Sequence, residues 1–164
     1  IKFDIRSDDM INIEEKRRGE FIHKVLSFVE YAGNEFGEEL LKIIKRLKEA
    51  TGDEYSEKEM KTTIMELLSH KEISEYFRQK PDRDVRMEQE FSDGDGNLFR
   101  MDRVIIDRDK ITVVDFKTGK NTEAEEKYKN QMKTYMKILS GIYAGLSIEG
   151  IIAYVDLKEI RRVS

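Results

Sequence analysis

The chain of 164 residues contains no cysteine, no tryptophan and only one proline. Without cysteine it can hold neither a disulfide framework, nor a Cys-ligated zinc ion, nor an iron–sulfur cluster. No apolar run in the sequence approaches the ~18 residues that a membrane-spanning helix needs. We therefore expect no membrane partner, and the absence of cysteine fits a reducing, cytoplasmic setting.

Neither sign of charge dominates the chain. Lys and Arg number 30 and Asp and Glu number 34, which gives a net charge of −4. No overall positive field would draw such a chain to nucleic acid, so any binding of nucleic acid must come from local features. Charged residues are abundant at 39%, but hydrophobic residues at 38% with clear periodicity predict a folded chain rather than disorder.

The character of the sequence changes near Pro81, the only proline. Before it, apolar residues recur with the spacing of an amphipathic helix. This spacing predicts a helix that begins near Gly19, a second over 38–50, a third that begins at Ser56 with a capping signature, and a short one over 72–77.

After this proline the apolar period shortens to two, which is typical of strands. The expected elements are strands over 85–91, 98–107, 110–117 and 148–157, and a helix over 123–139. The predicted fold class is mixed α/β (α+β), with a central mixed β-sheet flanked by helices. We predict one domain over 1–164, in which 1–80 is mainly helical and 81–164 forms a β-β-β-α-β core.

Charged residues interrupt the predicted strands. Asp102 and Asp115 lie among apolar residues, although Asp is disfavoured in strands and a buried unpaired charge costs several kcal/mol. Asp115 and Lys117 share one face because they are two residues apart. A two-residue loop at Arg108 and Asp109 would place Asp102 opposite Asp115, whereas a four-residue loop would place it opposite Lys117. In both registers Asp102 joins the face of Asp115 and Lys117.

Two carboxylates this close repel each other unless one is protonated or a cation lies between them. Mg²⁺ and Mn²⁺ prefer carboxylate oxygens as ligands. A lysine beside such an ion suits the stabilisation of charge on a phosphate or the activation of a water. The spacing alone leaves one alternative open, a structural Asp–Lys ion pair near a sheet edge.

Asp102 followed by Asp115-Phe116-Lys117 resembles the signature of the PD-(D/E)xK nuclease superfamily, an acid on one strand and acid-x-Lys on the next. The likeness extends to the RecB/AddA-type nuclease domain, the C-terminal domain of bacterial UvrD/Rep-like helicase–exonucleases. Phe99 stands where many members of that family have glycine. The matching segments, in the order of the family, are Gly19-x-x-x-His23, Met101-Asp102-Arg103-Val104, Val114-Asp115-Phe116-Lys117-Thr118-Gly119 and Gln131-x-x-x-Tyr135.

This resemblance implies an αβββαβ restriction-endonuclease-like core and a Mg²⁺- or Mn²⁺-dependent deoxyribonuclease, with exonuclease action expected. It implies DNA as a partner, an ATP-dependent helicase domain in cis, and a second nuclease or helicase subunit, in DNA repair and recombination. The chain would then be a fragment of a larger helicase–nuclease. By the same resemblance the metal ligands are His23, Asp102, Asp115 and the backbone carbonyl of Phe116, Lys117 positions or activates the attacking water, and Gln131 and Tyr135 orient DNA or support Lys117.

Two other interpretations remain. The chain could be a catalytically inactive DNA-binding or interaction module that keeps the nuclease fold, although such a module has no chemical need for all the charged positions. It could also be a different metal-dependent enzyme built on an unrelated sheet. Glu88 matches an acid of the family on the preceding strand without an assigned role, and residues 33–81 carry no motif.

Overall fold

The computed structural model describes residues 7–164, with side chains from Ile13 onward. Among these residues, no helix combines the length and the apolar character needed to cross a membrane. The elements in chain order are α1 (Ser7–Ser27), α2 (Gly37–Thr51), α3 (Glu57–Leu68), the 3₁₀ helix η1 (Ser74–Phe77), β1 (Asp84–Ser92), β2 (Leu98–Ile106), β3 (Lys110–Lys117), α4 (Glu125–Ile142), β4 (Ser147–Tyr154) and β5 (Glu159–Val163).

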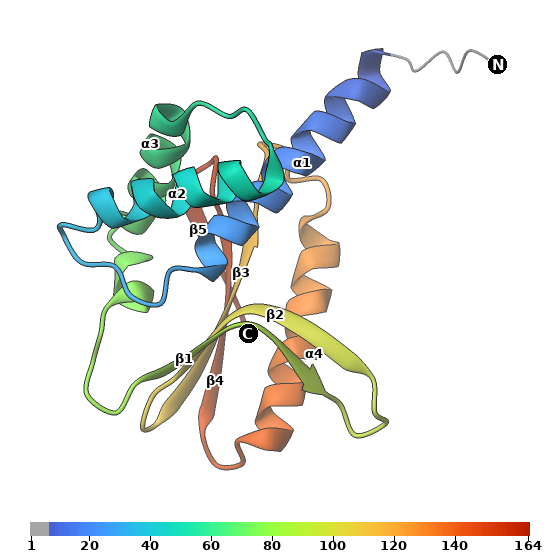
Figure 1. Cartoon of the computed structure of the whole chain (residues 1–164). Coiled ribbons are helices and arrows are strands. Elements are labelled where there is room, and N and C mark those ends of the chain that lie inside the picture. Colours follow the sequence, from blue (N-terminus) through green and yellow to red (C-terminus); the bar gives the residue numbers. More distant parts are fainter. Residues whose placement is uncertain (1–6) are drawn as a thin grey trace.

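A five-stranded sheet with the order β1-β2-β3-β4-β5 forms the centre of the molecule (Figure 1). Neighbouring strands are antiparallel except β3 and β4, which run parallel and are connected through α4. Parallel neighbours need a crossover of this kind, because a tight turn can join only antiparallel strands. The predicted mixed sheet with flanking helices is therefore confirmed.

Both faces of the sheet are covered. The helices α1, α2 and α3, together with η1, pack over the face that carries Val114 and Phe116. The other face, which carries Val113, packs against Met132 and Leu139 of α4. β3 is accordingly buried along nearly its whole length, as expected for a central strand covered on both faces.

The second and third helices lie where the sequence predicts them. In α2, the side chains of Leu40, Ile44 and Leu47 are buried in the protein core. At the start of α3, the Ser56 side chain accepts a hydrogen bond from the backbone N–H of Glu59 at 3.3 Å. This contact is the predicted N-cap of α3. The short helix predicted over 72–77 is a single 3₁₀ segment, η1.

The first helix is longer than predicted, since it begins at Ser7 rather than near Gly19. Residues 13–17 of this helix are exposed and include Glu14, Glu15, Lys16 and Arg17, which are strong helix formers but form no apolar stripe. Ile22, Val25 and Leu26 become fully buried only where α1 reaches the sheet. Hydrophobic periodicity therefore detected only the packed half of α1.

The last predicted strand, over 148–157, is longer than the strand observed there, and the sequence does not predict the strand that follows it. β4 ends at Tyr154, the chain turns through Lys158 at a φ of +53°, and β5 pairs antiparallel with β4. β5 lies at the edge of the sheet, where charged side chains such as Arg161 and Arg162 are tolerated and discourage pairing with other chains. This charge explains why its sequence lacks the pattern of a buried strand.

The sequence left open whether the loop between β2 and β3 has two or four residues, and in the structure it has two. The backbone N–H of Asp107 donates to the carbonyl of Lys110 at 2.9 Å, which leaves Arg108 and Asp109 as the loop. Neither loop residue has a positive φ, so the hairpin closes without the left-handed conformations that favour glycine and asparagine.

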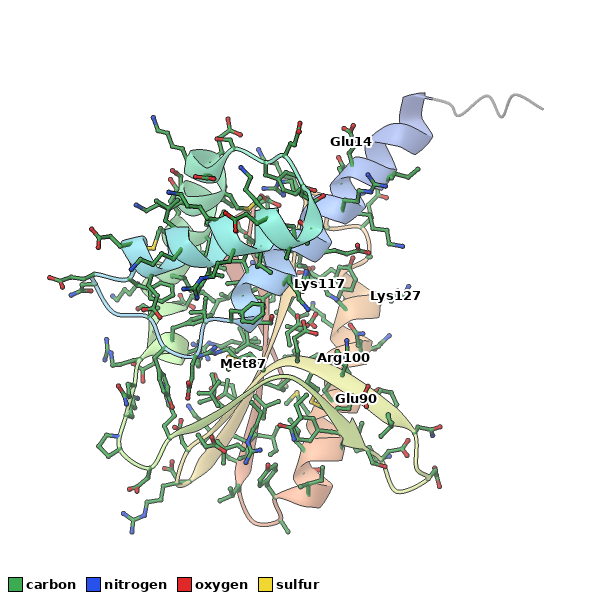
Figure 2. The ribbon with its side chains drawn as sticks, viewed as in Figure 1. Glu14, Met87, Glu90, Arg100, Lys117 and Lys127 are labelled. Atoms are coloured by element: carbon green, nitrogen blue, oxygen red, sulfur yellow. The ribbon has the colours of Figure 1, made fainter. Side chains whose placement is uncertain are left out.

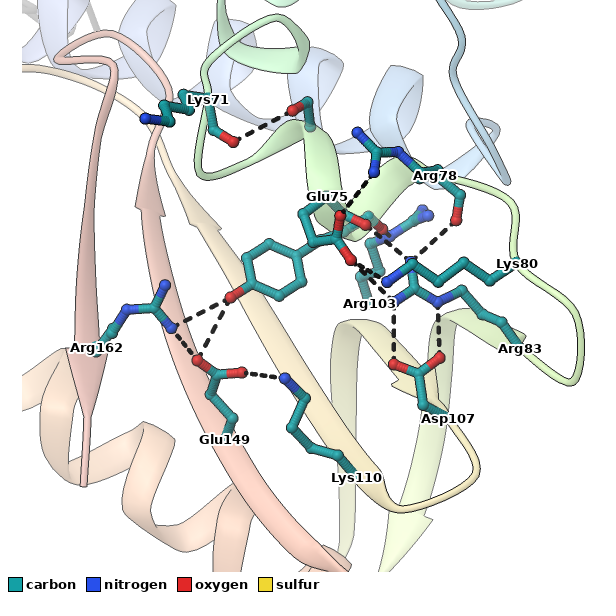
Figure 3. Close-up of polar contacts among 12 residues, drawn as sticks. Lys71, Glu75, Arg78, Lys80, Arg83, Arg103, Asp107, Lys110, Glu149 and Arg162 are labelled. Atoms are coloured by element: carbon teal, nitrogen blue, oxygen red, sulfur yellow. Dashed lines mark hydrogen bonds and ion pairs between the residues drawn. The ribbon is translucent and has the colours of Figure 1, made fainter.

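Arg83 connects this end of the hairpin to η1 through an ion pair and hydrogen bonds (Figure 3). The buried guanidinium of Arg83 donates to both carboxylate oxygens of Asp107, at 2.7 and 2.9 Å. It also donates to the carbonyls of Glu75 and Arg78, at 2.8 and 2.9 Å. The hydrogen bonds from Arg83 are the largest influence on Asp107 and hold the pKa of its carboxyl below the usual range.

Candidate active site

The β2–β3 ladder ends where the predicted carboxylates begin. Its last pair is Arg103 with Val114, so the next opposed positions in this register are Asp102 and Asp115. Of the two registers that the sequence left open, the structure has the one with the two-residue loop, and the register with Asp102 opposite Lys117 is wrong. The carboxylate of Asp102 here accepts the backbone N–H of Phe116 at 2.9 Å, which replaces main-chain pairing. The two acids therefore lie where β2 and β3 part.

Asp115 is the more buried of the two acids, with an exposed fraction of only 7%. Burial and then the nearby charge of Asp102 raise its pKa to about 6, although Lys117 opposes the shift. The Nζ of Lys117 lies 2.8 Å from Oδ2 of Asp115. Lys117 therefore does not fully offset the effects of burial and of Asp102 on the Asp115 carboxylate.

His23 reaches the acids from α1. Its Nε2 lies 2.6 Å from the carbonyl oxygen of Phe116 and 3.4 Å from Oδ2 of Asp102, and its Nδ1 lies 2.8 Å from the carbonyl of Gly19. Burial disfavours a charged ring, but the hydrogen bond and charge of Asp102 and the two carbonyls outweigh it and raise the pKa of His23 to about 9. Burial likewise opposes ionisation of Asp102, yet the contact with His23 lowers the pKa of that carboxyl.

A close approach of α1 to the end of β3 makes the reach of His23 possible. A Cβ on Gly19 would lie only 2.6 Å from Oγ1 of Thr118, a separation at which atoms must move apart. Thr118 is short and branched, so it cannot swing away as the tip of a long side chain can. Gly19 therefore lets α1 pack against the residue that follows Lys117, and His23 lies one turn further along the helix.

A second contact between α1 and this loop was not predicted. Arg18 donates to both oxygens of Asp156 at 2.9 and 2.6 Å, and Asp156 accepts the backbone N–H of Gly119 at 2.6 Å. Gly119 has a φ of +84°, a conformation that glycine adopts without strain. This network ties the loop after Lys117 to α1 and to the end of β4. The sequence signal for it is an acid near the end of the apolar strand predicted over 148–157.

The helix α4 supplies the remaining side of the site. Its Gln131 accepts a hydrogen bond from Nζ of Lys117 at 3.3 Å, and the same nitrogen lies 4.2 Å from the ring centre of Tyr128. Tyr135 is buried, and burial together with the charges of Asp115 and Asp102 raises the pKa of its hydroxyl to about 12. Lys117 therefore lies between α1 and the β1–β2 hairpin, beside α4 (Figure 2).

Glu88 faces Asp102 from β1. The ladder pairs on either side of Glu88 are regular, but Glu88 itself has a φ of +51° and makes no ladder pair. Its carboxylate lies 3.8 Å from the guanidinium of Arg100 on β2. A positive φ in a residue with a Cβ costs roughly 1–2 kcal/mol, so the strand is strained beside the site.

The residue after Asp102 anchors β2 on the opposite face. Arg103 is 1% exposed and donates to the carbonyls of Val29 at 2.6 Å and Tyr76 at 3.1 Å, while its guanidinium lies 4.0 Å from the ring centre of Phe77. Burial lowers the pKa of Arg103 to about 9. Because Val29 lies two residues after the end of α1, this contact holds the end of the His23 helix against β2.

Among the described residues, no group of three His, Cys, Asp or Glu side chains is arranged so that it could hold a metal ion. His23, Asp102 and Asp115 do converge, but His23 is bonded to a carbonyl and Asp115 to Lys117. The set of donors, one imidazole, two carboxylates and the carbonyl of Phe116, nevertheless suits a hard divalent cation. Burial and the neighbouring charge of Asp102 make the ionised form of Asp115 costly, and a bound cation would offset both effects.

The comparisons with known proteins agree with this geometry. A search of curated proteins found no match. A family model described as the PD-(D/E)XK nuclease superfamily matches residues 4–163, a range that includes the His23 helix and every strand of the sheet. The mixed sheet with its flanking helices is consistent with the restriction-endonuclease-like fold of that family. The chain therefore belongs to the PD-(D/E)XK nuclease superfamily.

Proposed function

We propose that the chain is a Mg²⁺- or Mn²⁺-dependent deoxyribonuclease that hydrolyses phosphodiester bonds. Membership of the superfamily indicates a nuclease, and the choice of DNA and of the metal is our proposal. The observation that carries it is the convergence of Asp102, Asp115 and Lys117 where β2 and β3 part. Buried acids with perturbed pKa values cluster at functional sites, and a cation between two close carboxylates would relieve their repulsion.

Four groups would hold the ion: the side chains of His23, Asp102 and Asp115 and the carbonyl oxygen of Phe116. A divalent cation bound there would lower the pKa of a bound water and polarise the scissile phosphate. His23 would bind through Nε2, which now contacts Phe116, while its Nδ1–H stays on the carbonyl of Gly19 and orients the ring.

The other side chains would act on the phosphate and the water. Lys117 would place its positive charge against the oxygens that become more negative as the bond breaks. Gln131 would hold Lys117 through the hydrogen bond that it already accepts. Tyr135 is protonated at neutral pH, and its raised pKa extends this to more alkaline solution, so its hydroxyl could donate a hydrogen bond near the acids. Arg100 and Lys127 are exposed on β2 and α4, which also carry Asp102 and Gln131, and each could contact the DNA backbone (Figure 2).

The resemblance of the motifs to RecB/AddA-type domains supports a more specific proposal. In it the chain is the exonuclease part of a larger helicase–nuclease in DNA repair and recombination, with a helicase domain in cis and a second nuclease or helicase subunit. The single-domain boundary at 1–164 and a cytoplasmic setting belong to the same proposal.

The test is cleavage of end-labelled single- and double-stranded DNA with Mg²⁺, with Mn²⁺ and with EDTA. Wild type is compared with Asp115→Asn and Lys117→Met, and with Asp109→Asn as a control in the exposed hairpin loop. We expect metal-dependent cleavage by wild type and the control, and none by the two site variants. The product pattern distinguishes exonuclease from endonuclease action.

An absence of cleavage by folded wild type with either metal would contradict the proposal. Retained DNA binding in that case would favour the inactive binding module. Cleavage that persists in EDTA, or in both site variants, would show that the bond is broken elsewhere.

A further inference from the structure

The ammonium group of Lys117 is held on three sides. Its Nζ lies 2.8 Å from a carboxylate oxygen of Asp115, 3.3 Å from the amide oxygen of Gln131 and 4.2 Å from the ring centre of Tyr128. The side chain of Lys117 is only 19% exposed, so these neighbours replace much of its water. Neither the sequence motifs nor the family match assigns a role to Tyr128.

We infer that Tyr128 is a positioning residue, whose ring face holds the Lys117 ammonium in place for the nuclease reaction; the inference rests on the proposed function. A ring face attracts a cation within about 6 Å of its centre through its quadrupole. It does so without accepting a directed hydrogen bond. An ammonium has three N–H donors, and Asp115 and Gln131 engage two of them. The ring thus fixes the charge and leaves a donor for the substrate.

The ring matters most when Asp115 has another partner. In the proposed function Asp115 helps to bind a divalent cation, whose charge repels the Lys117 ammonium and weakens their present contact. A lysine side chain regains rotamer entropy when it is released, which favours its leaving the site. Contacts that do not depend on Asp115 are then needed to keep Lys117 in the site.

Both of these contacts come from one rigid element. Tyr128 and Gln131 are three residues apart on α4, so they lie on the same side of the helix. Met132 and Leu139 fix α4 by packing against the sheet. The position of Lys117 is thereby set by α4 as well as by its own strand.

The test replaces Tyr128 by phenylalanine and by phenylalanines with one, two and three ring fluorines. Fluorine withdraws negative charge from the ring face and changes the volume little, so a purely structural role would not follow the number of fluorines. We expect kcat close to wild type for Tyr128→Phe, a stepwise fall with fluorination, and a loss of about three- to tenfold in Tyr128→Leu. KM for DNA and the metal concentration at half-maximal rate should stay unchanged.

A second measurement needs neither DNA nor metal. In the contact described, the Tyr128 ring shifts the NMR signals of the methylene protons beside the Lys117 ammonium. The shift should persist in Tyr128→Phe and disappear in Tyr128→Leu. Tyr143→Leu is the matched control, because Tyr143 is also half-buried and packs against the same core at the other end of α4. It should change neither kcat nor the Lys117 signals.

A kcat that does not vary with fluorination overturns the inference, and so do Lys117 signals that are the same in Tyr128→Leu and in wild type. Equal losses of kcat in Tyr128→Leu and Tyr143→Leu would also overturn it, because they would indicate a general effect on α4. If wild type cleaves no DNA, the proposed function fails, while the NMR measurement still decides whether Tyr128 places Lys117.

Discussion

Two carboxylates at opposite ends of the β2–β3 hairpin have opposite electrostatic surroundings. Asp107 receives two hydrogen bonds from Arg83, and its pKa is lowered. Asp115 is buried beside Asp102 with only Lys117 in compensation, and its pKa is raised to about 6. The hairpin therefore holds a satisfied acid at its closed end and an uncompensated one where its strands part. The first stabilises the fold, and the second is suited to bind charge from outside.

The largest expected effects come from neutralising the two acids one at a time, which tests whether their roles differ. Asp115→Asn should lower the rate of DNA cleavage by roughly a thousandfold or more, because a ligand that the cation needs is lost. Its free energy of unfolding in EDTA should stay equal or rise, because repulsion with Asp102 is relieved. Cleavage assays and urea denaturation of the same preparations measure both quantities.

Asp107→Asn is the counterpart of that variant. It leaves the buried guanidinium of Arg83 without its charged partner, so the free energy of unfolding should fall by about 2 kcal/mol. The cleavage rate per folded molecule should not change. A large loss of cleavage in Asp107→Asn, or a large loss of stability in Asp115→Asn, would remove the distinction between the two acids.

The approach of α1 is the next largest effect. Gly19→Ala should lower the cleavage rate about ten- to a hundredfold, because a Cβ against Thr118 pushes His23 away from the acids. Thr118→Ala should restore most of the loss in the double variant, since it removes the clashing oxygen. Gly33→Ala is the control, because a Cβ there meets nothing within 4 Å. A double variant as slow as Gly19→Ala would argue against steric displacement.

The two acids also predict opposite dependences of stability on pH. The pKa of Asp107 is lower in the folded chain, so its contribution is present above the unfolded pKa of about 3.9 and is lost as the pH falls through the folded value. The pKa of Asp115 is raised to about 6, so the folded state binds more protons and gains stability as the pH falls from about 6 towards about 4.

Urea denaturation in EDTA between pH 3 and pH 7 measures these slopes. Asp115→Asn should remove the gain in stability as the pH falls from about 6 to about 4, and Asp107→Asn should reduce the loss at lower pH. Identical pH profiles for wild type and Asp115→Asn would be inconsistent with an uncompensated acid at that position.

The smallest effect concerns the strained acid beside the site. Glu88→Gly should raise the free energy of unfolding by about 0.5–1 kcal/mol, because glycine adopts a positive φ without strain. Glu90→Gly, in a regular part of the same strand, should instead lower it by a similar amount. A loss of stability in Glu88→Gly would mean that contacts of the Glu88 side chain outweigh the backbone strain.

Local pattern alone located the chemistry on β2 and β3. The alternation of apolar residues sets β3, the two-residue loop sets the register, and the register places Asp102 opposite Asp115. The strand and the face that carries these charges depend on neighbours in sequence, so they could be predicted, whereas the length of the loop and the register were left open. The helices α2 and α3 were predictable for the same reason, since their buried residues repeat with the helical period.

What surrounds these acids depends on contacts between distant parts of the chain. His23 meets Phe116 across 93 positions and Arg18 meets Asp156 across 138, and no local periodicity encodes either pairing. The resemblance to a family named His23, but only the packing of Gly19 against Thr118 explains how it reaches the acids.

The sequence by itself therefore determined the sheet core, the face that carries the carboxylates and the membership of a nuclease family. Tertiary structure alone decided the full length of α1, the edge strand β5, the clamp at Arg103 and the ring of Tyr128 beside Lys117. The physical reason is that a charged helix turn or edge strand buries no periodic face. A buried charge, in turn, has its energy set by whichever distant groups the fold brings to it.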